Sequence, residues 1–173
     1  QDYYNEDLLY KMFGINAELL IDHAWGYEPV TMDLIKSYRP ETNCISSGQV
    51  LHCAMDFTKT KIIVREMAEQ LAMDLMAKKL VTDQIVLTVG YDIDNLKIPE
   101  IADHYHGEIT VDRYGRSVPK HAHGTGNLTT MTASLSKITE TTMGLYERIV
   151  NPSLLTRRIT LTANHLKDAD KVK

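Results

Sequence analysis

The sequence is short of cysteine, of long apolar runs and of leader-like segments, and each shortage excludes a class of protein. Only Cys44 and Cys53 are cysteines among the 173 residues, too few for a disulfide framework. No apolar run approaches the roughly 18 residues that a membrane-spanning helix needs. The first residues lack the basic-then-apolar layout of a signal peptide. We therefore expect a soluble, cytoplasmic protein with no membrane partner, whose two thiols are reduced and buried in a strand.

Net positive charge is also lacking. The formal charge is -4 at pH 7, which argues mildly against a nucleic-acid binder because phosphate neutralisation supplies most non-specific affinity. The acidic residues gather in the first third and around residues 92–103, whereas basic residues crowd the second half. These basic residues are Arg113, Arg116, Lys120, Lys137, Arg148, Arg157 and Arg158. An acidic chain with this asymmetry can still carry one basic face.

Residues 1–28 are predicted to form two short helices. Apolar residues from Leu8 to Phe13 recur at helical spacing, Gly14 ends that helix, and Asn16 is the expected N-cap of the second. This helical hairpin is too small to bury a core of its own, so we expect it to belong to a domain truncated upstream. Residues 29–42 contain two prolines and a polar run, which indicates a linker.

Residues 43–173 alternate strands and helices in the order β-α-β, then β-α-β. Strands are expected over 44–53 with a bulge at Gly48, and over 84–91, 125–134 and 157–164. Helices are expected over 58–79, capped by Thr58, and over 136–149. This order is typical of an α+β fold of the ferredoxin-like kind, with a four-stranded antiparallel sheet and two helices on one face. Residues 95–123 form an insertion, expected to be a hairpin that turns near 113–115.

The last strand indicates which side chains the uncovered face presents. Ile159, Leu161 and Ala163 alternate with polar residues, so the apolar set is expected to face the helices. The other set is Arg158, Thr160, Thr162 and Asn164. All four can donate hydrogen bonds of the kind that contact phosphates.

Two groups of residues have a spacing that a metal ion can use. Asp92 and Asp94 form an Asp-x-Asp pair, and the insertion holds two His-x-His pairs, made by His104, His106, His121 and His123. We favour solvated loop and surface side chains in both cases, because no third carboxylate follows the aspartates and the insertion is otherwise polar. Since no nucleophile, base and orienting group come together either, the sequence predicts no catalytic residue and no metal site.

The turn at Gly14, Ile15 and Asn16 is a candidate DNA contact. Backbone N–H groups at the start of the second helix, aided by the helix dipole, can bind a phosphate without reading base sequence. A plain connection between two helices explains the same residues equally well.

Several segments together resemble the Y-family translesion DNA polymerases, the UmuC- and DinB-like (ImpB/MucB/SamB) group. LLYKMFGINAELLIDHAWG (Leu8 to Gly26) resembles the end of their thumb, and NCISSGQVL (Asn43 to Leu51) resembles the first strand of their little-finger domain. The helix IVREMAEQLAMDL, the strand QIVLTVGYD and the strand TRRITLTANHL follow in the family's order. The likeness covers nearly all the chain. The long insertion at 95–123 and a third strand without the arginine often found there depart from the family.

The resemblance implies a non-catalytic, DNA-gripping fragment: the end of the thumb (1–28), a linker (29–42) and the little finger (43–173). Such polymerases act in translesion synthesis, DNA repair and the SOS response, and their palm, which this chain would lack, holds the magnesium ions. The implied partner is primer-template DNA, gripped with an affinity that falls steeply with salt. The residues implied to contact it are Gly14, Ile15, Asn16, Arg39, Ser46, Ser47, Thr125, Asn127, Thr129, Arg157, Arg158, Thr160 and Thr162.

Two other functions remain open from the sequence. A ferredoxin-like RNA-binding module usually displays aromatic side chains on its open face, and these strands offer threonine and arginine instead. A protein-interaction module that docks a sliding clamp is the third possibility, although no clamp-binding peptide is evident.

Overall fold

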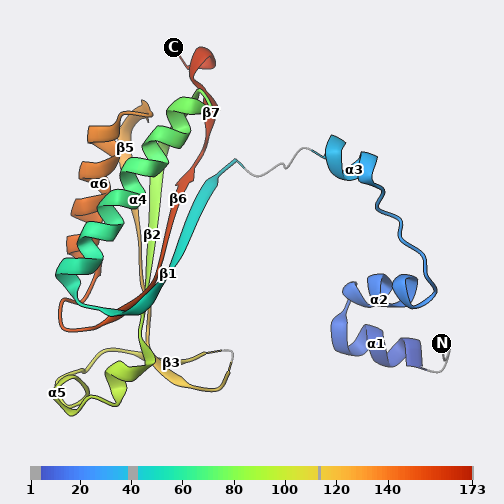
Figure 1. Cartoon of the computed structure of the whole chain (residues 1–173), viewed down its shortest axis with the longest axis horizontal. Coiled ribbons are helices and arrows are strands. Elements are labelled where there is room, and N and C mark those ends of the chain that lie inside the picture. The colour runs from blue at the N-terminus through green and yellow to red at the C-terminus, as the bar shows by residue number, and fades with distance from the viewer. Residues whose placement is uncertain (1–4, 39–42, 113, 173) are drawn as a thin grey trace. The chain divides into compact units, whose positions relative to one another are not determined.

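The chain divides into two units, Gln1–Glu41 and Thr42–Lys173 (Figure 1). The structure is a computed structural model that describes residues 5–38, 43–112 and 114–172. It is mixed α+β with a largely antiparallel sheet, so the fold class predicted from the sequence is confirmed. None of the helices in the described ranges is both long enough and apolar enough to span a bilayer.

The first unit contains α1 (Glu6–Phe13), α2 (Asn16–Ala24) and α3 (Met32–Ser37). Gly14 ends α1 as predicted: its φ of 58° lies in the left-handed region, and its N–H donates to the Tyr10 carbonyl oxygen at 2.9 Å. The predicted cap at Asn16 is wrong, because Ile15 holds the N-cap position without a side-chain hydrogen bond and Asn16 is already helical. The segment predicted to be a linker contains a helix, α3, that the sequence did not predict. Its first turn is stabilised where Leu34 N donates to the Thr31 hydroxyl at 3.3 Å.

The described part of the first unit has no hydrophobic core. Ala17 is its only buried residue. Its large apolar side chains are exposed: Leu8, Tyr10, Met12, Phe13, Ile15, Leu19, Leu20, Trp25, Tyr27, Val30, Met32, Leu34, Ile35 and Tyr38. Three short helices that bury so little apolar surface lack the main driving force for folding. This agrees with the expectation that the helical hairpin cannot bury a core alone.

The second unit is built on a sheet of four long strands in the order β1 (Ile45–Met55), β6 (Thr156–Asn164), β2 (Leu80–Tyr91) and β5 (Ala122–Thr132). Each neighbouring pair is antiparallel, and the short β7 (Lys167–Asp168) pairs with the start of β2. It follows that β1 and β2 are parallel with β6 between them, and that β5 and β6 are parallel with β2 between them. The fold therefore consists of two interlocked split βαβ units.

The crossover helices α4 (Phe57–Ala77) and α6 (Leu135–Ile149) lie on the same face of this sheet (Figure 1). The two crossovers run in opposite directions across the sheet and start from strands of opposite direction. Two right-handed crossovers arranged in this way are related by a two-fold rotation about the sheet normal, which places both helices on one side. Within residues 43–112 and 114–172, no helix covers the opposite face of the four long strands.

The core lies between the sheet and the two helices. Ile159, Leu161 and Ala163 of β6 are fully buried in it, which confirms the alternation predicted for the last strand. Ile85, Leu87 and Val89 of β2 are fully buried as well and show the same alternation. Helical spacing in the sequence predicts a buried stripe of Val64, Met67, Leu71, Leu75 and Lys78 on α4. The four apolar members are buried, whereas Lys78, the C-cap of the helix, is exposed. The N-cap of α4 is Asp56, whose carboxylate accepts from Lys59 N at 2.9 Å, and not Thr58, which lies inside the first turn.

The first strand differs from its prediction in two respects. Gly48 pairs regularly with Thr160, and the irregularity comes later, between Val50 and Met55. Cys44 and Cys53 are exposed and free, whereas the sequence predicted buried thiols. The reason is topological: β1 is an edge strand, Cys44 precedes it, and Cys53 lies in its irregular part, where pairing with β6 is interrupted.

Two glycines in β5 allow α6 to pack closely on the sheet. A Cβ atom at Gly124 would lie 2.9 Å from Ile149 Cγ2, and one at Gly126 would lie 2.8 Å from Thr141 Cγ2. These distances are shorter than real carbon–carbon contacts, so α6 can pack this close to the sheet only if both positions lack a side chain. They also show that Gly124 and Gly126 lie on the buried face of β5.

We expect Gly124→Val to lower the free energy of unfolding by about 1–3 kcal/mol, because the added carbons force α6 off the sheet. The matched control is Gly144→Ala in α6, where an added Cβ meets nothing within 4 Å. That substitution should instead stabilise the helix by about 0.5–1 kcal/mol. Urea titration of both variants measures the two effects. Equal stability of the variants would show that α6 does not pack as described.

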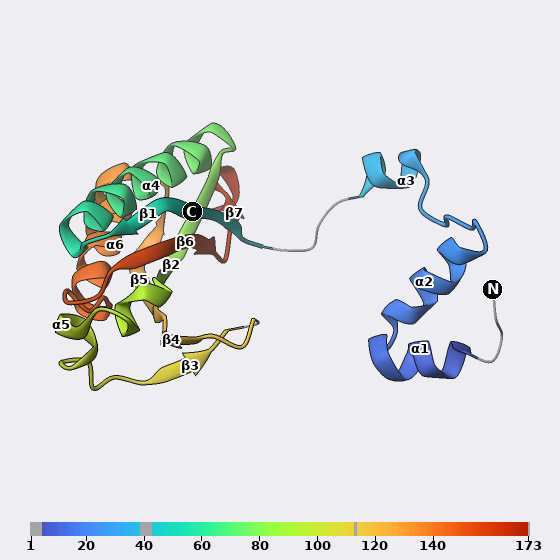
Figure 2. The ribbon, with the colours of Figure 1, turned by 60° about the horizontal axis from the view of Figure 1, so that its bottom comes forward.

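The insertion forms a short 3-10 helix (Ile93–Leu96), α5 (Pro99–Ala102) and a hairpin of β3 (Ile109–Val111) and β4 (Ser117–Pro119). The hairpin pairs Thr110 with Val118, and Gly115 in its turn has a φ of 77°, so the predicted turn position is confirmed. Figures 1 and 2 show this hairpin beyond the ends of the four long strands.

Candidate nucleic-acid interface

We define the open face as the side chains of the four long strands that point away from the helices. Strand pairing places opposite residues on the same side, so the set follows from the register. It comprises Ser46, Gly48 and Val50 of β1, Arg158, Thr160, Thr162 and Asn164 of β6, Gln84, Val86, Thr88 and Gly90 of β2, and His123, Thr125 and Asn127 of β5. None of these residues is acidic, and none is phenylalanine, tyrosine or tryptophan.

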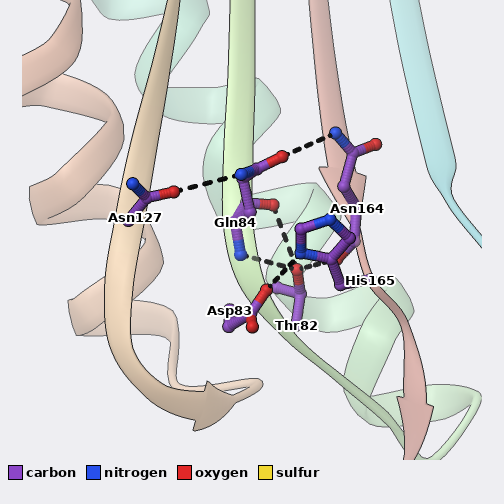
Figure 3. Close-up of polar contacts among 6 residues, drawn as sticks. All are labelled: Thr82, Asp83, Gln84, Asn127, Asn164 and His165. Carbon is purple, nitrogen blue, oxygen red and sulfur yellow. Dashed lines mark hydrogen bonds and ion pairs between the residues drawn. The ribbon is translucent and has the colours of Figure 1, made fainter.

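Amide side chains form a hydrogen-bonded row across three strands of this face (Figure 3). Gln84 Nε2 donates to Asn127 Oδ1 at 3.1 Å, and Asn164 Nδ2 donates to Gln84 Oε1 at 3.0 Å. This row fixes the orientation of all three amides and leaves the remaining N–H groups of Asn127 and Asn164 available for other acceptors. Fixed donors lose little conformational entropy when they bind a ligand.

Buried Thr82 anchors the backbone of Gln84, the middle residue of that row. Its hydroxyl accepts from Gln84 N at 3.1 Å and lies 3.0 Å from the Gln84 carbonyl oxygen (Figure 3). Beside it, His165 Nδ1 lies 2.8 Å from Asp83 Oδ1. These contacts coincide with the shift in pairing between Thr82 and Gln84, so they hold the bulge that brings Gln84 to the open face.

Hydroxyl groups occupy the centre of the open face. Ser46 Oγ lies 2.8 Å from Thr162 Oγ1 across β1 and β6, and Thr88 Oγ1 lies 2.9 Å from His123 Nδ1 across β2 and β5. A hydroxyl can donate and accept at once, so each pair can still donate outward. The centre therefore presents neutral donors at regular spacing.

Two consecutive arginines lie together at the far end of β6. In a regular strand Arg157 and Arg158 would point to opposite faces, but the register shifts so that Gly90 pairs with Arg158 and Tyr91 pairs with Thr156. This bulge leaves Arg157 as an extra residue, and both arginines line the same hollow. Arg157 Nε is 3.8 Å from Asp92 Oδ2. In the described ranges Arg158 has no carboxylate within ion-pair distance.

A buried asparagine holds the chain that leads into this bulge. Asn95 is fully buried, and its Nδ2 donates to the carbonyl oxygens of Asp92 and Leu155, both at 2.8 Å. Its Oδ1 accepts from Leu155 N at 2.7 Å. Since Leu155 comes immediately before β6, Asn95 of the insertion fixes the backbone that positions the two arginines.

The hollow beside the arginines has a volume of about 740 Å³ and lies between the end of the sheet and the β3–β4 hairpin. It is lined by Val50, Gly90, Tyr91, Asp92, Ile93, Asp94, Asp112, Tyr114, Arg116, Val118, Arg157 and Arg158. Arg116 forms an ion pair with Asp112 at 2.7 Å, and that hydrogen-bonded guanidinium holds the pKa of the Asp112 carboxyl below its ordinary value. Burial raises the pKa of the Tyr91 phenol, whose oxygen accepts from Asn151 N at 2.9 Å.

Most of the β-strand residues implied by the resemblance lie on the open face: Ser46, Thr125, Asn127, Arg158, Thr160 and Thr162. Ser47 does not, because it pairs with the core residue Leu161 and points to the helix side. Thr129 is exposed beyond Asn127, where β5 leaves its regular pairing with β2. Arg39 lies outside the described residues.

The turn at Gly14, Ile15 and Asn16 belongs to the first unit and is exposed. Ala17 N and Glu18 N donate to the carbonyl oxygens of Gly14 and Ile15, at 3.0 and 3.2 Å. These two amides are used within the turn, which leaves fewer N–H groups for a phosphate than the sequence suggested.

The basic residues do not gather on one face as their position in the sequence suggested. Arg148 lies on α6 and donates to the Thr125 carbonyl oxygen at 3.1 Å, and Lys120 is paired with Glu108 at 2.7 Å. In the described ranges no three His, Cys, Asp or Glu side chains are grouped so as to hold a metal. The sequence reasoning overlooked Gln84, Thr88, His123 and Asn95; the alternation in β2 pointed to the first two.

Comparison with known proteins adds no relative. No protein-family model matches the chain, and no curated protein matches it significantly.

Proposed function

We propose that the Thr42–Lys173 unit binds the sugar-phosphate backbone of primer-template DNA on its open face. The chain would be the DNA-gripping, non-catalytic C-terminal part of a Y-family polymerase that acts in translesion synthesis and DNA repair. The observation that carries the proposal is the composition of the open face. It is a wide surface of hydroxyl and amide groups with Arg158 at its end and no carboxylate to repel phosphates.

The chemistry of this face suits backbone contact better than base reading. Hydroxyl, amide and guanidinium groups are the side chains that contact phosphate and sugar oxygens, and such contacts carry no sequence information. A sheet that binds single-stranded RNA stacks bases on aromatic side chains, and the open face has no phenylalanine, tyrosine or tryptophan. This favours DNA backbone over RNA. The magnesium ions used by such polymerases are proposed to be held elsewhere in the parent protein.

The structure makes the expected salt dependence smaller than the sequence suggested. Two arginines, Arg157 and Arg158, lie at the end of the open face, and each neutralised phosphate contributes about -0.9 to the slope of log affinity against log salt. We therefore expect a slope of about -2 for duplex DNA, with little difference among base sequences.

Fluorescence anisotropy with a labelled duplex over a range of salt concentrations measures this slope. Arg157→Ala/Arg158→Ala should bring it close to zero and weaken binding at low salt, because the remaining contacts are neutral. Lys59→Ala/Arg65→Ala removes two cations from α4, on the helix side, and should leave the slope unchanged. A slope that responds equally to both double variants would show that the contact is not at the open face.

A further inference from the structure

We infer that the hollow between the β3–β4 hairpin and the bulged end of β6 is a second nucleic-acid site, which takes an unpaired, single-stranded stretch. This inference rests on the proposed function, because it describes where a strand goes after it crosses the open face. The hollow and the open face are continuous: Val50, Gly90 and Arg158 belong to both.

The position of the hairpin favours a single strand over a duplex in the hollow. The hairpin lies beyond the ends of the four long strands (Figures 1 and 2), and it shares the hollow with the open-face residues Val50, Gly90 and Arg158. Its residues Asp112, Tyr114, Arg116 and Val118 form the opposite wall of the hollow. A rigid duplex that runs along the face meets this wall, whereas one flexible strand can enter between the wall and β6.

The charge of the hollow suits a phosphodiester chain. Each of its three carboxylates has a cation close by: Asp92 is 3.8 Å from Arg157, Asp94 is 2.7 Å from Lys97, and Asp112 is 2.7 Å from Arg116. Arg158 is the lining cation left over after these pairs. The lining itself is formally neutral, with three arginines and three aspartates. What favours a phosphate is the Arg158 guanidinium, which has no ion-pair partner in the described ranges and lies beside the last residues of the open face, where a strand would enter.

The hairpin turn presents a rigid stack on which a base can be placed. Asp112 Oδ1 accepts from Tyr114 N at 2.9 Å and from Arg116 N at 3.0 Å, and its Oδ2 accepts from Arg116 Nε at 2.8 Å. These bonds hold the Arg116 guanidinium 5.0 Å from the centre of the Tyr114 ring, and Tyr114 is 66% exposed. An exposed aromatic ring stacked with a guanidinium is an arrangement by which proteins bind unpaired bases.

The test compares two labelled hairpin oligonucleotides with the same stem, one blunt and one with a single-stranded thymidine extension, by anisotropy with the full chain. The wild type should bind the extended probe about tenfold tighter, the gain expected for stacking of about one base. Tyr114→Ala should lose this gain and keep the affinity for the blunt probe. Tyr114→Phe should keep the gain, because stacking needs the ring and not the hydroxyl.

Val111→Ala is the matched control, since Val111 is 70% exposed on the same hairpin but does not line the hollow. Its preference for the extended probe should equal that of the wild type. If the wild type binds both probes equally, and its affinity still depends on Arg157 and Arg158, the single-strand site is refuted while the proposed function stands. If the chain binds neither probe, both proposals fail.

Discussion

Charge reversal of the two β6 arginines is expected to abolish the retention of duplex DNA. Arg157→Glu/Arg158→Glu removes two charged hydrogen-bond donors, each worth about 1.5–3 kcal/mol, and replaces them with charges that repel phosphate. The predicted loss of affinity therefore exceeds about a hundredfold. Anisotropy or gel-shift titration at low salt measures it.

The control for this prediction is Lys59→Glu/Arg65→Glu, which makes the same change in net charge on α4. Both side chains are exposed there, and DNA affinity should fall by less than about threefold through long-range repulsion alone. Arg158→Glu alone is a second check, since a new glutamate at 157 would stand beside Asp92 and disturb the bulge. A double reversal that binds DNA as well as the control refutes the role of the arginines.

Loss of the buried Asn95 carboxamide is expected to be the most damaging single change in the insertion. Asn95→Leu keeps the size of the side chain but removes its three hydrogen bonds, and it leaves Leu155 N without its acceptor. The cost is about 2–4 kcal/mol, which corresponds to a fall of roughly 10 °C in the thermal midpoint of a unit of this size. Calorimetry or a circular-dichroism melt measures it.

The same substitution should also weaken DNA binding at temperatures where the unit is still folded, because Leu155 no longer holds the start of β6 in place. Asp94→Ala is the control from the same turn; its carboxylate is 58% exposed and pairs with Lys97, so both stability and affinity should change little. If Asn95→Leu combined with Arg157→Ala/Arg158→Ala binds no more weakly than the arginine variant alone, Asn95 acts through the arginines. Independent, additive losses would contradict that role.

The sequence predicted the sheet and its open face best where a strand is covered on one side only. The alternation of Ile159, Leu161 and Ala163 with threonine and arginine is a local signal of period two, and burial against the helices makes it strict. The same holds for Ile85, Leu87 and Val89. The order of strands and helices predicted the fold class, and the alternation predicted the β6 part of the open face. The β1 and β5 residues of that face were named only through the resemblance.

The bulge at Arg157 could not be derived in that way. It depends on the register between β6 and β2, which is set by contacts far apart in sequence, among them those of Asn95 with Leu155. A strict alternation would have separated Arg157 from Arg158. Alternation does separate Ser46 from Ser47, as the register shows; the resemblance had grouped these two serines as DNA contacts. The exposure of Cys44 and Cys53 was missed for a related reason, since only the strand order shows that β1 is an edge.

The N-cap residues of two helices were also predicted wrongly. Asp56 and Thr58 are both competent caps, and in the structure Asp56 has the extended backbone of a cap and accepts from Lys59 N. Asn16 is likewise a competent cap, yet the turn at Gly14 leads directly into α2 and brings Ile15 to that position. The hollow had no sequence signal, because its walls come from the insertion and from three separate strands.

The most direct test of the open face as a DNA-binding surface is a nuclear magnetic resonance titration of the chain with duplex DNA. The largest chemical-shift changes should fall on the open-face residues, including Thr88, Asn127, Arg158 and Thr162, with little change along α4. Shifts that concentrate on α4 and α6, or that are absent at DNA concentrations well above that of the chain, would contradict the account.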